Sequence, residues 1–201
     1  RKALTLGLDR NRLIQDLLTS GDEQYGRTSV GTVSPAFSDW IADITPLPVD
    51  VAQAKALLES SGWSDSDSDG FVDKDGQPLA FGLLVQTGSD ELKRIAVMSQ
   101  AMWKDVGIRV DLEMVDPLQF TRRARAKEYD ALLWSFGANP TVDPTIKWHT
   151  DGAYNWFGYS NSAVDEAIAA GVSSTDVSES QKQFRKVQRL VYEDQPATFL
   201  Y

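Results

Sequence analysis

Four aspartates in one short stretch could bind a metal ion. Three of them alternate along the chain and a fourth follows: Asp65, Asp67, Asp69 and Asp73. This spacing matches the first half of an EF-hand calcium loop, in which alternating carboxylates supply hard oxygen ligands and a glycine, here Gly70, permits a sharp turn. Gly76 stands where such a loop places its bidentate glutamate, so Asp73 or Asp75 would have to substitute. Two interpretations stay open, a structural calcium site or an acidic turn without a cation.

A second candidate site lies where a predicted strand ends. Residues 129–134 form an apolar run typical of a buried strand, and a polar, proline-containing loop follows it as far as Asp143-Pro144. In an open α/β sheet, ligands bind in the crevice beyond the carboxyl ends of the strands. We therefore predict that this loop contributes to a binding site, with Trp134 and Asn139 as its first candidates.

The sequence gives little support for catalysis. His149 is the only histidine, so a zinc site of the common type is excluded, and a Ser-His-Asp triad would need Asp143 or Asp151 and a serine without any nucleophile-elbow motif. Carboxylate pairs on predicted helices point about 100° apart, which is typical of solvated faces: Asp165 with Glu166, and Glu193 with Asp194. We predict a protein that is not an enzyme, and a supporting role for His149, with a nickel or haem contact as the alternative.

The elements that must position these residues form an α/β pattern. Strands and helices alternate over five segments: a strand at 79–86, a helix at 90–106, a strand at 108–115, a helix opened by Pro117 and a strand at 129–134. This order predicts a βαβαβ unit with an open parallel sheet.

Flanking helices are predicted before and after this unit. Two short helices fill residues 1–18 on either side of Asp9, and Asp50 caps a helix at 51–61. After the sheet, helices are predicted at 162–170 and 178–193. Ser178 and Gln181 have the spacing of a capping box at the start of the last helix, and residues 197–201 are expected to form a strand.

Composition bounds the class of protein. The 201 residues suit one domain, with two small domains as the alternative, and the formal charge of −9 argues against nucleic acid or an anionic membrane as partner. No run approaches the roughly 20 apolar residues of a membrane span, so we expect membrane association only through an upstream anchor or a partner.

The chain opens with Arg1-Lys2 rather than methionine, and we expect a segment to precede it. The absence of cysteine excludes disulfides and thiolate metal sites.

Seven segments follow one another along the chain: RKALTLGLDRNRLI, VDVAQAKALLESSGW, DSDSDGFVDKDGQPLAFGLLV, MWKDVGIRVDLEMVDPLQF, EYDALLWSF, NWFGYSNSAVDEAI and RKVQRLVYEDQPATFLY. Taken in this order, they resemble family 5 of the extracellular solute-binding proteins of ABC importers, the dipeptide, oligopeptide and nickel class. The resemblance implies that residues 1–201 are the second lobe of a two-lobed Venus-flytrap receptor with a periplasmic-binding-protein type II fold. Both ends of the chain would then lie near the hinge.

The resemblance also implies a function and a set of ligand contacts. The receptor would be periplasmic or at the cell surface, monomeric, and would close on a small solute or peptide before delivering it to an ABC permease. Peptide-binding members hold the ligand termini with a carboxylate and an arginine, but the corresponding stretches 137–139 and 86–89 contain neither. The remaining candidate contacts are neutral and mostly aromatic: Trp134, Phe136, Asn139, Trp148, Tyr154, Asn155, Trp156 and Tyr159.

Alternatives remain at this stage. Each of these aromatic residues could instead be an ordinary core residue, because aromatic side chains are mostly buried. The missing carboxylate and arginine favour, as a rival function, a non-transporting scaffold or a regulatory lipoprotein with the same shape. An enzyme of unknown type is the third possibility. No cofactor other than a structural calcium ion is expected.

Overall fold

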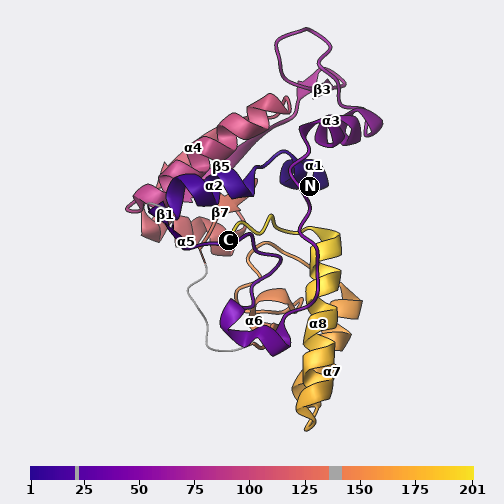
Figure 1. Ribbon diagram of the computed structural model, residues 1–201. Coiled ribbons are helices and arrows are strands. Elements are labelled where there is room, and N and C mark those ends of the chain that lie inside the picture. Colours follow the sequence, from indigo (N-terminus) through magenta and orange to yellow (C-terminus); the bar gives the residue numbers. More distant parts are fainter. Residues whose placement is uncertain (21–22, 136–141) are drawn as a thin grey trace. The chain divides into compact units, whose positions relative to one another are not determined.

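The computed structural model of the protein describes residues 1–20, 23–135 and 142–201, and these fall into two compact units (Figure 1). Unit 1 contains Arg1–Thr28, Leu47–Trp134 and Tyr201, and unit 2 contains Ser29–Pro46 and Ser135–Leu200. Each unit is therefore built from separate stretches of the chain. The expectation of one lobe over residues 1–201 stays a prediction, because a lobe can hold more than one compact unit.

A parallel sheet forms the centre of unit 1. Its described strands are β5 (Ala80–Gln86), β6 (Arg109–Val115) and β7 (Ala131–Leu133), in the order β6-β5-β7. The pairing with β6 runs from Ala80↔Arg109 along the whole of β5, whereas β7 pairs only with residues 83–85. Three consecutive residues of β5 are buried, as expected for a strand covered on both faces: Leu83, Leu84 and Val85. The predicted βαβαβ unit is confirmed.

Strand β7 is shorter than the predicted strand at 129–134, and Asp130 explains where it begins. The Asp130 carboxylate accepts a hydrogen bond from the Gly82 N–H at 2.9 Å. Gly82 lies on β5 one residue before the β7 pairing begins at Leu83. The side chain of Asp130 therefore takes the donor that a longer β7 would have used.

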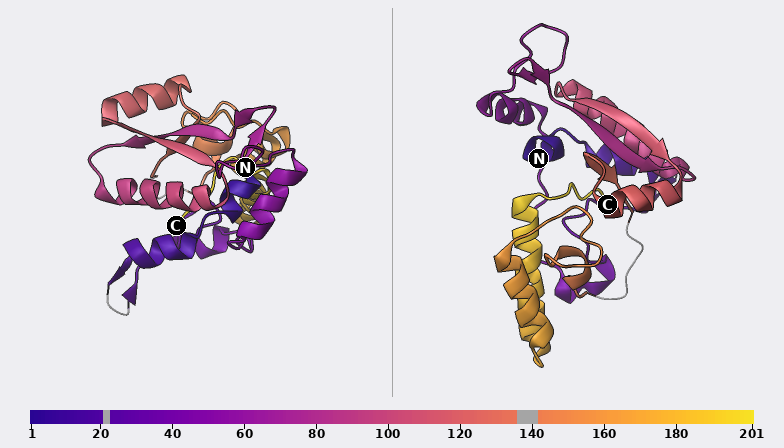
Figure 2. Two further views of the ribbon diagram at one scale, coloured as in Figure 1. Left: turned by 90° about the horizontal axis from the view of Figure 1, so that it is seen from above. Right: turned by 180° about the vertical axis from the view of Figure 1, so that it is seen from behind.

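Unit 1 also contains the helices α1 (Lys2–Leu6), α2 (Arg10–Leu17), α3 (Val51–Ser60), α4 (Asp90–Asp105) and α5 (Pro117–Ala126). Of these, α4 and α5 pack against the strands, while α1 packs against α3. Figure 2 shows α4 and α5 on opposite sides of the strands. Capping confirms two predicted helix starts, because Asp9 accepts from the Arg12 N–H at 3.0 Å and Asp50 accepts from the Gln53 N–H at 2.8 Å.

Two short antiparallel hairpins complete unit 1. One pairs β1 (Thr19–Ser20) with β2 (Glu23–Gln24), and the other pairs β3 (Asp73–Lys74) with β4 (Gln77–Pro78). The second hairpin turns at Asp75-Gly76, where both residues have positive φ, 53° and 72°. Asp-Gly with two positive φ angles is the favoured sequence of a type I′ turn, and its twist matches the flanking strands.

Unit 2 is mainly helical. It contains η1 (Pro35–Trp40), α6 (Thr145–Trp148), α7 (Ser162–Ser173) and α8 (Val177–Asp194), and α7 and α8 pack side by side. Gln188 of α8 binds the segment Ser29–Pro46 of the same unit. Its side-chain amide accepts a hydrogen bond from the Ala42 N–H at 3.1 Å and donates one to the Trp40 carbonyl at 2.7 Å. Among the described residues of both units, no helix combines the length and apolar character of a membrane span.

The structure corrects three predictions in unit 2. Helix α7 extends to Ser173 instead of ending at residue 170. The predicted capping box at Ser178 is wrong, because Asp176 caps α8 and its carboxylate accepts from the Ser178 N–H and hydroxyl, both at 2.9 Å. The predicted strand at 197–201 is also wrong, because none of these residues lies in a strand, although the Ser29 N–H donates to the Leu200 carbonyl at 3.3 Å.

Gly171 allows α7 and α8 to approach closely. A Cβ atom at this position would lie 2.4 Å from a ring carbon of the buried Phe184. We expect Gly171→Ala to lower the free energy of unfolding by about 2 kcal/mol, the usual cost of overpacking a core, in urea denaturation of the chain. Gly31→Ala is the matched control, because its Cβ would meet nothing closer than 4.0 Å. Equal stability of the two variants would show that the helices separate without cost.

Candidate functional site

The carboxyl ends of the parallel strands form the edge at which the binding loop was predicted. Gln86 of β5 pairs with Val115 of β6, and the Thr87 N–H donates to the Val115 carbonyl at 2.7 Å beyond them. Trp134 follows directly after β7 at the same edge and is partly exposed. Phe136 and Asn139, the other candidates of this loop, lie outside the described residues. Their predicted ligand contacts stay predictions.

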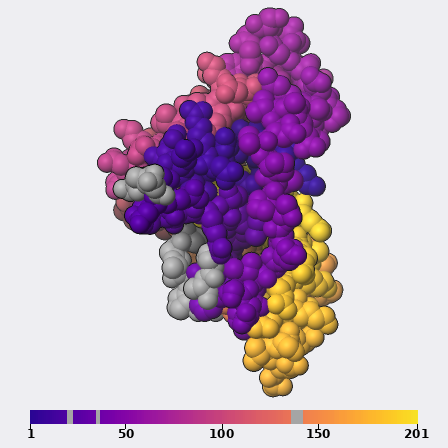
Figure 3. Space-filling model, viewed as in Figure 1, coloured from indigo at the N-terminus to yellow at the C-terminus, as the bar shows by residue number. Residues whose placement is uncertain are grey.

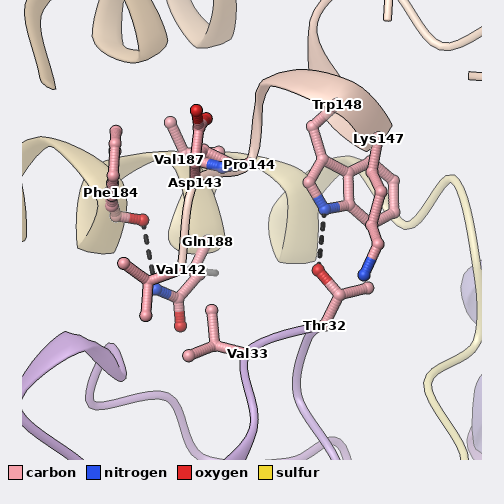
Figure 4. Close-up of a pocket in the computed structure, with 10 residues that line it drawn as sticks. All are labelled: Thr32, Val33, Val142, Asp143, Pro144, Lys147, Trp148, Phe184, Val187 and Gln188. Carbon is pink, nitrogen blue, oxygen red and sulfur yellow. Dashed lines mark hydrogen bonds between the residues drawn. The ribbon is translucent and has the colours of Figure 1, made fainter. Parts of the chain in front are cut away.

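Trp148 packs inside unit 2. Its side chain is 4% exposed, and its ring centroid lies 5.1–5.9 Å from three other rings, those of Phe157, Tyr159 and Phe199. Its indole Nε1–H donates to Thr32 Oγ1 at 3.1 Å (Figure 4). These contacts account for Trp148 as a core residue of unit 2, and a ligand role for it stays a prediction.

Asn155 is buried and bonded to the surrounding backbone. Its amide nitrogen, which carries two hydrogens, lies within hydrogen-bond distance of three carbonyl oxygens, those of His149 at 3.1 Å, Thr150 at 3.1 Å and Tyr159 at 2.6 Å. Its carbonyl oxygen accepts from the Tyr159 N–H at 2.9 Å. The residue is 6% exposed. The Asn155 side chain therefore links the backbone at His149 and Thr150 to the backbone at Tyr159.

Tyr154 and Trp156, on either side of Asn155, form an aromatic pair. Their ring centroids lie 5.6 Å apart with an interplanar angle of 82°, the edge-to-face arrangement that the charge distribution of the rings favours. Tyr154 is 41% exposed, and the Trp156 indole N–H donates to the Ala153 carbonyl at 3.0 Å. The structure thus brings Tyr154 and Trp156 together on one loop of unit 2, whereas Trp134 belongs to unit 1.

Tyr159 joins the same loop to the end of α8. Its hydroxyl donates to Asp194 Oδ2 at 2.7 Å, and that oxygen also accepts from the Asn161 amide at 2.8 Å. Burial, followed by the bond to Asp194 and its negative charge, raises the pKa of Tyr159. The carboxylate of Asp194 therefore accepts two hydrogen bonds within unit 2.

A pocket in unit 2 was missed by the sequence analysis. Its volume is about 20 Å³, enough for a single water molecule and far below that of a solute site. Lys147 and Trp148 of α6 reach towards Thr32 at this pocket (Figure 4), and burial lowers the pKa of Lys147. The lining residues are Thr32, Val33, Val142, Asp143, Pro144, Lys147, Trp148, Phe184, Val187 and Gln188.

Three of the four predicted metal ligands come together in the acidic loop of residues 65–73, which lies on the surface at the top of Figure 3. One carboxylate oxygen each from Asp65, Asp67 and Asp69 can be chosen so that all lie within 4.8 Å of one another, and all three residues are exposed. Backbone N–H groups already donate to them, including that of Gly70 to Asp65 at 3.1 Å. Hard oxygens at this spacing fit part of a calcium coordination shell.

Asp73 is not part of that group. Its carboxylate accepts from the Ser66 N–H at 2.9 Å and from the Ser66 hydroxyl at 2.8 and 2.9 Å. These bonds favour the charged form and lower the pKa of Asp73. A lowered pKa means that the carboxylate stabilises the fold above its ordinary pKa, and that this contribution is lost as the pH falls through the lowered value.

We expect Ser66→Ala to raise the pKa of Asp73 towards its ordinary value, because the variant removes the hydroxyl donor. Titration of the Asp73 carboxyl carbon by NMR measures this change. Ser64→Ala is the control, since Ser64 pairs with Asp73 through backbone bonds of 2.8 and 3.0 Å that alanine keeps. An unchanged Asp73 titration in Ser66→Ala would assign the lowered pKa to the backbone donor alone.

His149 has Asp165 as its charged neighbour instead of Asp143 or Asp151. The distance from His149 Nε2 to Asp165 Oδ1 is 3.9 Å, and His149 Nδ1 accepts from the Asp151 N–H at 3.1 Å. The Asp165 carboxylate also accepts from the N–H and hydroxyl of Thr150, at 2.8 and 2.6 Å. These contacts join the loop to α7 and do not reproduce the order of groups in a hydrolase triad.

Comparison with known proteins relates the whole chain to solute receptors. The sequence profile of the "Bacterial extracellular solute-binding proteins, family 5 Middle" matches residues 1–158. The oligopeptide-binding protein AppA of Bacillus subtilis is 27% identical over 206 residues, covering 100% of this chain and 38% of AppA. The nickel-binding protein NikA of Staphylococcus aureus is 29% identical over 154 residues, covering 75% of this chain and 29% of NikA.

A solved structure confirms the fold. AppA in complex with a nonapeptide superposes with a TM-score of 0.88, covering 100% of this chain and 40% of that structure. The predicted fold class, that of a type II periplasmic binding protein, is confirmed. The chain spans well under half the length of the curated relatives it matches.

Proposed function

We propose that this chain, which belongs to the bacterial extracellular solute-binding proteins of family 5, is one lobe of a receptor that delivers a small solute to an ABC importer. The single observation that carries the proposal is the match of the entire chain to AppA in sequence and in structure. A peptide or related oligomer is the proposed solute, because AppA is described as an oligopeptide-binding protein.

The proposed mechanism is hinge closure outside the cytoplasm. Residues 1–201 would form the second lobe, and the other lobe would supply the remaining ligand contacts. A ligand that touches both lobes favours the closed state by the difference between its affinities for the closed and open states. The permease would then recognise the closed receptor. The 41% exposure of Tyr154 supports a contact role for this residue, and the position of Trp134 after β7 supports one for Trp134.

The test is a thermal-shift measurement on the intact protein with peptides, oligosaccharides and nickel chelates. A ligand that binds only the folded state at one hundred times its Kd adds about 2.7 kcal/mol of stability, and the melting temperature rises accordingly. We expect peptides to cause the largest rise. If none of the organic solutes changes the melting temperature, the non-transporting scaffold or regulatory lipoprotein becomes the better interpretation.

We also propose a structural calcium ion at the acidic loop, supported by the grouping of Asp65, Asp67 and Asp69. Bound calcium would offset the repulsion among these carboxylates, and we expect it to raise the melting temperature. Asp67→Asn removes one of the grouped charges and should abolish the rise, whereas Asp43→Asn, in another exposed stretch, should preserve it. A rise of equal size in both variants would place the calcium elsewhere.

A further inference from the structure

Helix α8, drawn in yellow in Figure 1, carries its basic side chains on one side. They are Lys182, Arg185, Lys186 and Arg189. Positions three and four residues apart lie on the same side of a helix, so these four side chains form a stripe of about two turns, the basic stripe of α8. The buried residues of α8, such as Phe184, lie on the opposite side. The stripe is therefore directed away from the core of unit 2.

The charges of the basic stripe are mostly unmatched. Lys186 and Arg189 are exposed, and in the described part of the chain neither makes a hydrogen bond or an ion pair. The Lys182 side chain is 71% exposed and pairs with Glu179 at 3.2 Å, whereas Arg185 donates to a backbone carbonyl of η1 at 2.7 Å. Among the described residues, Lys182 is thus the one member of the stripe that has a carboxylate partner.

Grouping these cations costs stability. Like charges three or four residues apart on a helix repel each other, and here Lys182 repels Arg185 and Lys186, while Arg189 repels the same two. Solubility does not require the grouping, because the chain already carries a formal charge of −9. An unfavourable arrangement that serves neither stability nor solubility points to a contact with another molecule.

The net charge of the chain selects the kind of anionic partner that fits the stripe. A membrane surface or a nucleic acid is an extended anion that meets the field of the whole chain, and the formal charge of −9 repels it. A discrete acidic patch on a protein meets mainly the stripe, because salt at physiological concentration screens charges beyond about 8 Å. Arg185 and Arg189 add specificity, since a guanidinium can form two parallel hydrogen bonds to one carboxylate.

We propose that the basic stripe of α8 docks against an acidic surface of the importer's permease. The inference rests on the proposed function and names the face of this chain that delivery would use. In that function the permease is the protein that the receptor must bind and release in every cycle. Exposed charges suit such a contact, because charges at the rim of an interface act mainly on the rate of association.

The test measures binding of the intact protein to the importer in nanodiscs of phosphatidylcholine, a lipid without net charge. The double variant Lys186→Glu/Arg189→Glu should weaken binding about tenfold, because like charges would face each other across the contact. Lys55→Glu/Lys93→Glu, at two exposed positions of unit 1, is the matched control. It changes the formal charge by the same amount and should bind as tightly as the wild type. The wild-type affinity should fall as salt is added.

The melting temperature of the double variant tests whether the stripe is unmatched within the fold. The two glutamates turn the repulsive pairs of Lys182 with position 186 and of Arg185 with position 189 into attractive ones, so the variant should melt no lower than the wild type. A lower melting temperature would mean that Lys186 and Arg189 stabilise the chain itself, and it would overturn the inference.

Three further outcomes separate this inference from the proposed function. Equal affinity of the double variant and its control overturns the inference, and a peptide-induced rise in melting temperature would then leave the receptor function standing. Co-sedimentation of the wild type with phosphatidylglycerol vesicles, lost in the double variant, would assign the stripe to anionic lipid instead. If the wild type does not bind the importer at all, delivery to it fails as a function, and the inference fails with it.

Discussion

Replacing Leu84 by alanine is expected to lower the free energy of unfolding by about 3 kcal/mol, within the range found for buried leucines. Leu84 is 0% exposed and lies on the central strand β5, where it pairs with Glu113 of β6 and with Leu132 of β7. Truncation would leave a cavity in the middle of the sheet, and the neighbouring strands cannot close it without losing their ladder bonds.

Urea denaturation measures the effect, and Leu118→Ala is the matched control. Leu118 is 80% exposed on α5, so its truncation should change stability by no more than about 0.5 kcal/mol. The m-value should stay the same in both variants, because the surface exposed on unfolding barely changes. Similar midpoints for the two leucine variants would mean that β5 is not the centre of the folding core.

The sheet could be predicted from the sequence because its determinants are local. An apolar run such as 83–85 fits a strand buried on both faces, and a proline at the first turn, here Pro117, favours the start of a helix. Asp9 and Asp50 cap the helices that they precede, through bonds across three residues. Where two capping residues lie close together, as Asp176 and Ser178 do, the local signal is ambiguous, and the prediction chose the wrong one.

Unit 2 was harder to predict because its contacts join distant parts of the chain. Gln188 bonds with Ala42 and Trp40, and Trp148 bonds with Thr32, over separations of more than a hundred residues. No periodic pattern in the sequence predicts such long-range hydrogen bonds. The sequence analysis therefore assigned no element to residues 22–49, whereas the structure places Ser29–Pro46 in unit 2 and packs η1 against α8.

The candidate site was predictable in its residue types but not in their roles. The resemblance grouped Trp148, Tyr154, Asn155 and Trp156 as neutral, mostly aromatic candidates for ligand contact. Only three-dimensional contacts show that Trp148 packs against three rings and that Asn155 bonds to the backbone, while Tyr154 stays 41% exposed. The metal ligands of the acidic loop were also only partly predictable. The spacing suggested four aspartate ligands, but in the structure Asp73 is bonded to Ser66 and lies outside the group formed by the other three.

Gly152→Ala is expected to destabilise the chain by about 3 kcal/mol, the upper end of the usual cost of overpacking. A Cβ atom at this position would lie 2.7, 2.8 and 3.0 Å from the carbonyl oxygens of Thr145, Ile146 and His149. These are backbone atoms of α6 and of its C-cap residue His149, so no side-chain rotation can relieve the contact. Two of the oxygens also accept loop hydrogen bonds, that of Ile146 from the Tyr154 N–H and that of His149 from the Asn155 amide.

The same substitution should therefore disturb the aromatic pair as well as the fold. We expect Gly152→Ala to lower the urea midpoint and to change the near-ultraviolet circular dichroism of the tryptophans, because the bonds that orient Tyr154 and Asn155 would lengthen. Gly31→Ala, whose Cβ would meet nothing closer than 4.0 Å in the same unit, should keep both readouts at wild-type values or gain slightly in stability. If Gly152→Ala matches Gly31→Ala in midpoint and spectrum, residues 149–161 can shift away from α6 at no cost, and the bonds to the Ile146 and His149 carbonyls do not fix this loop.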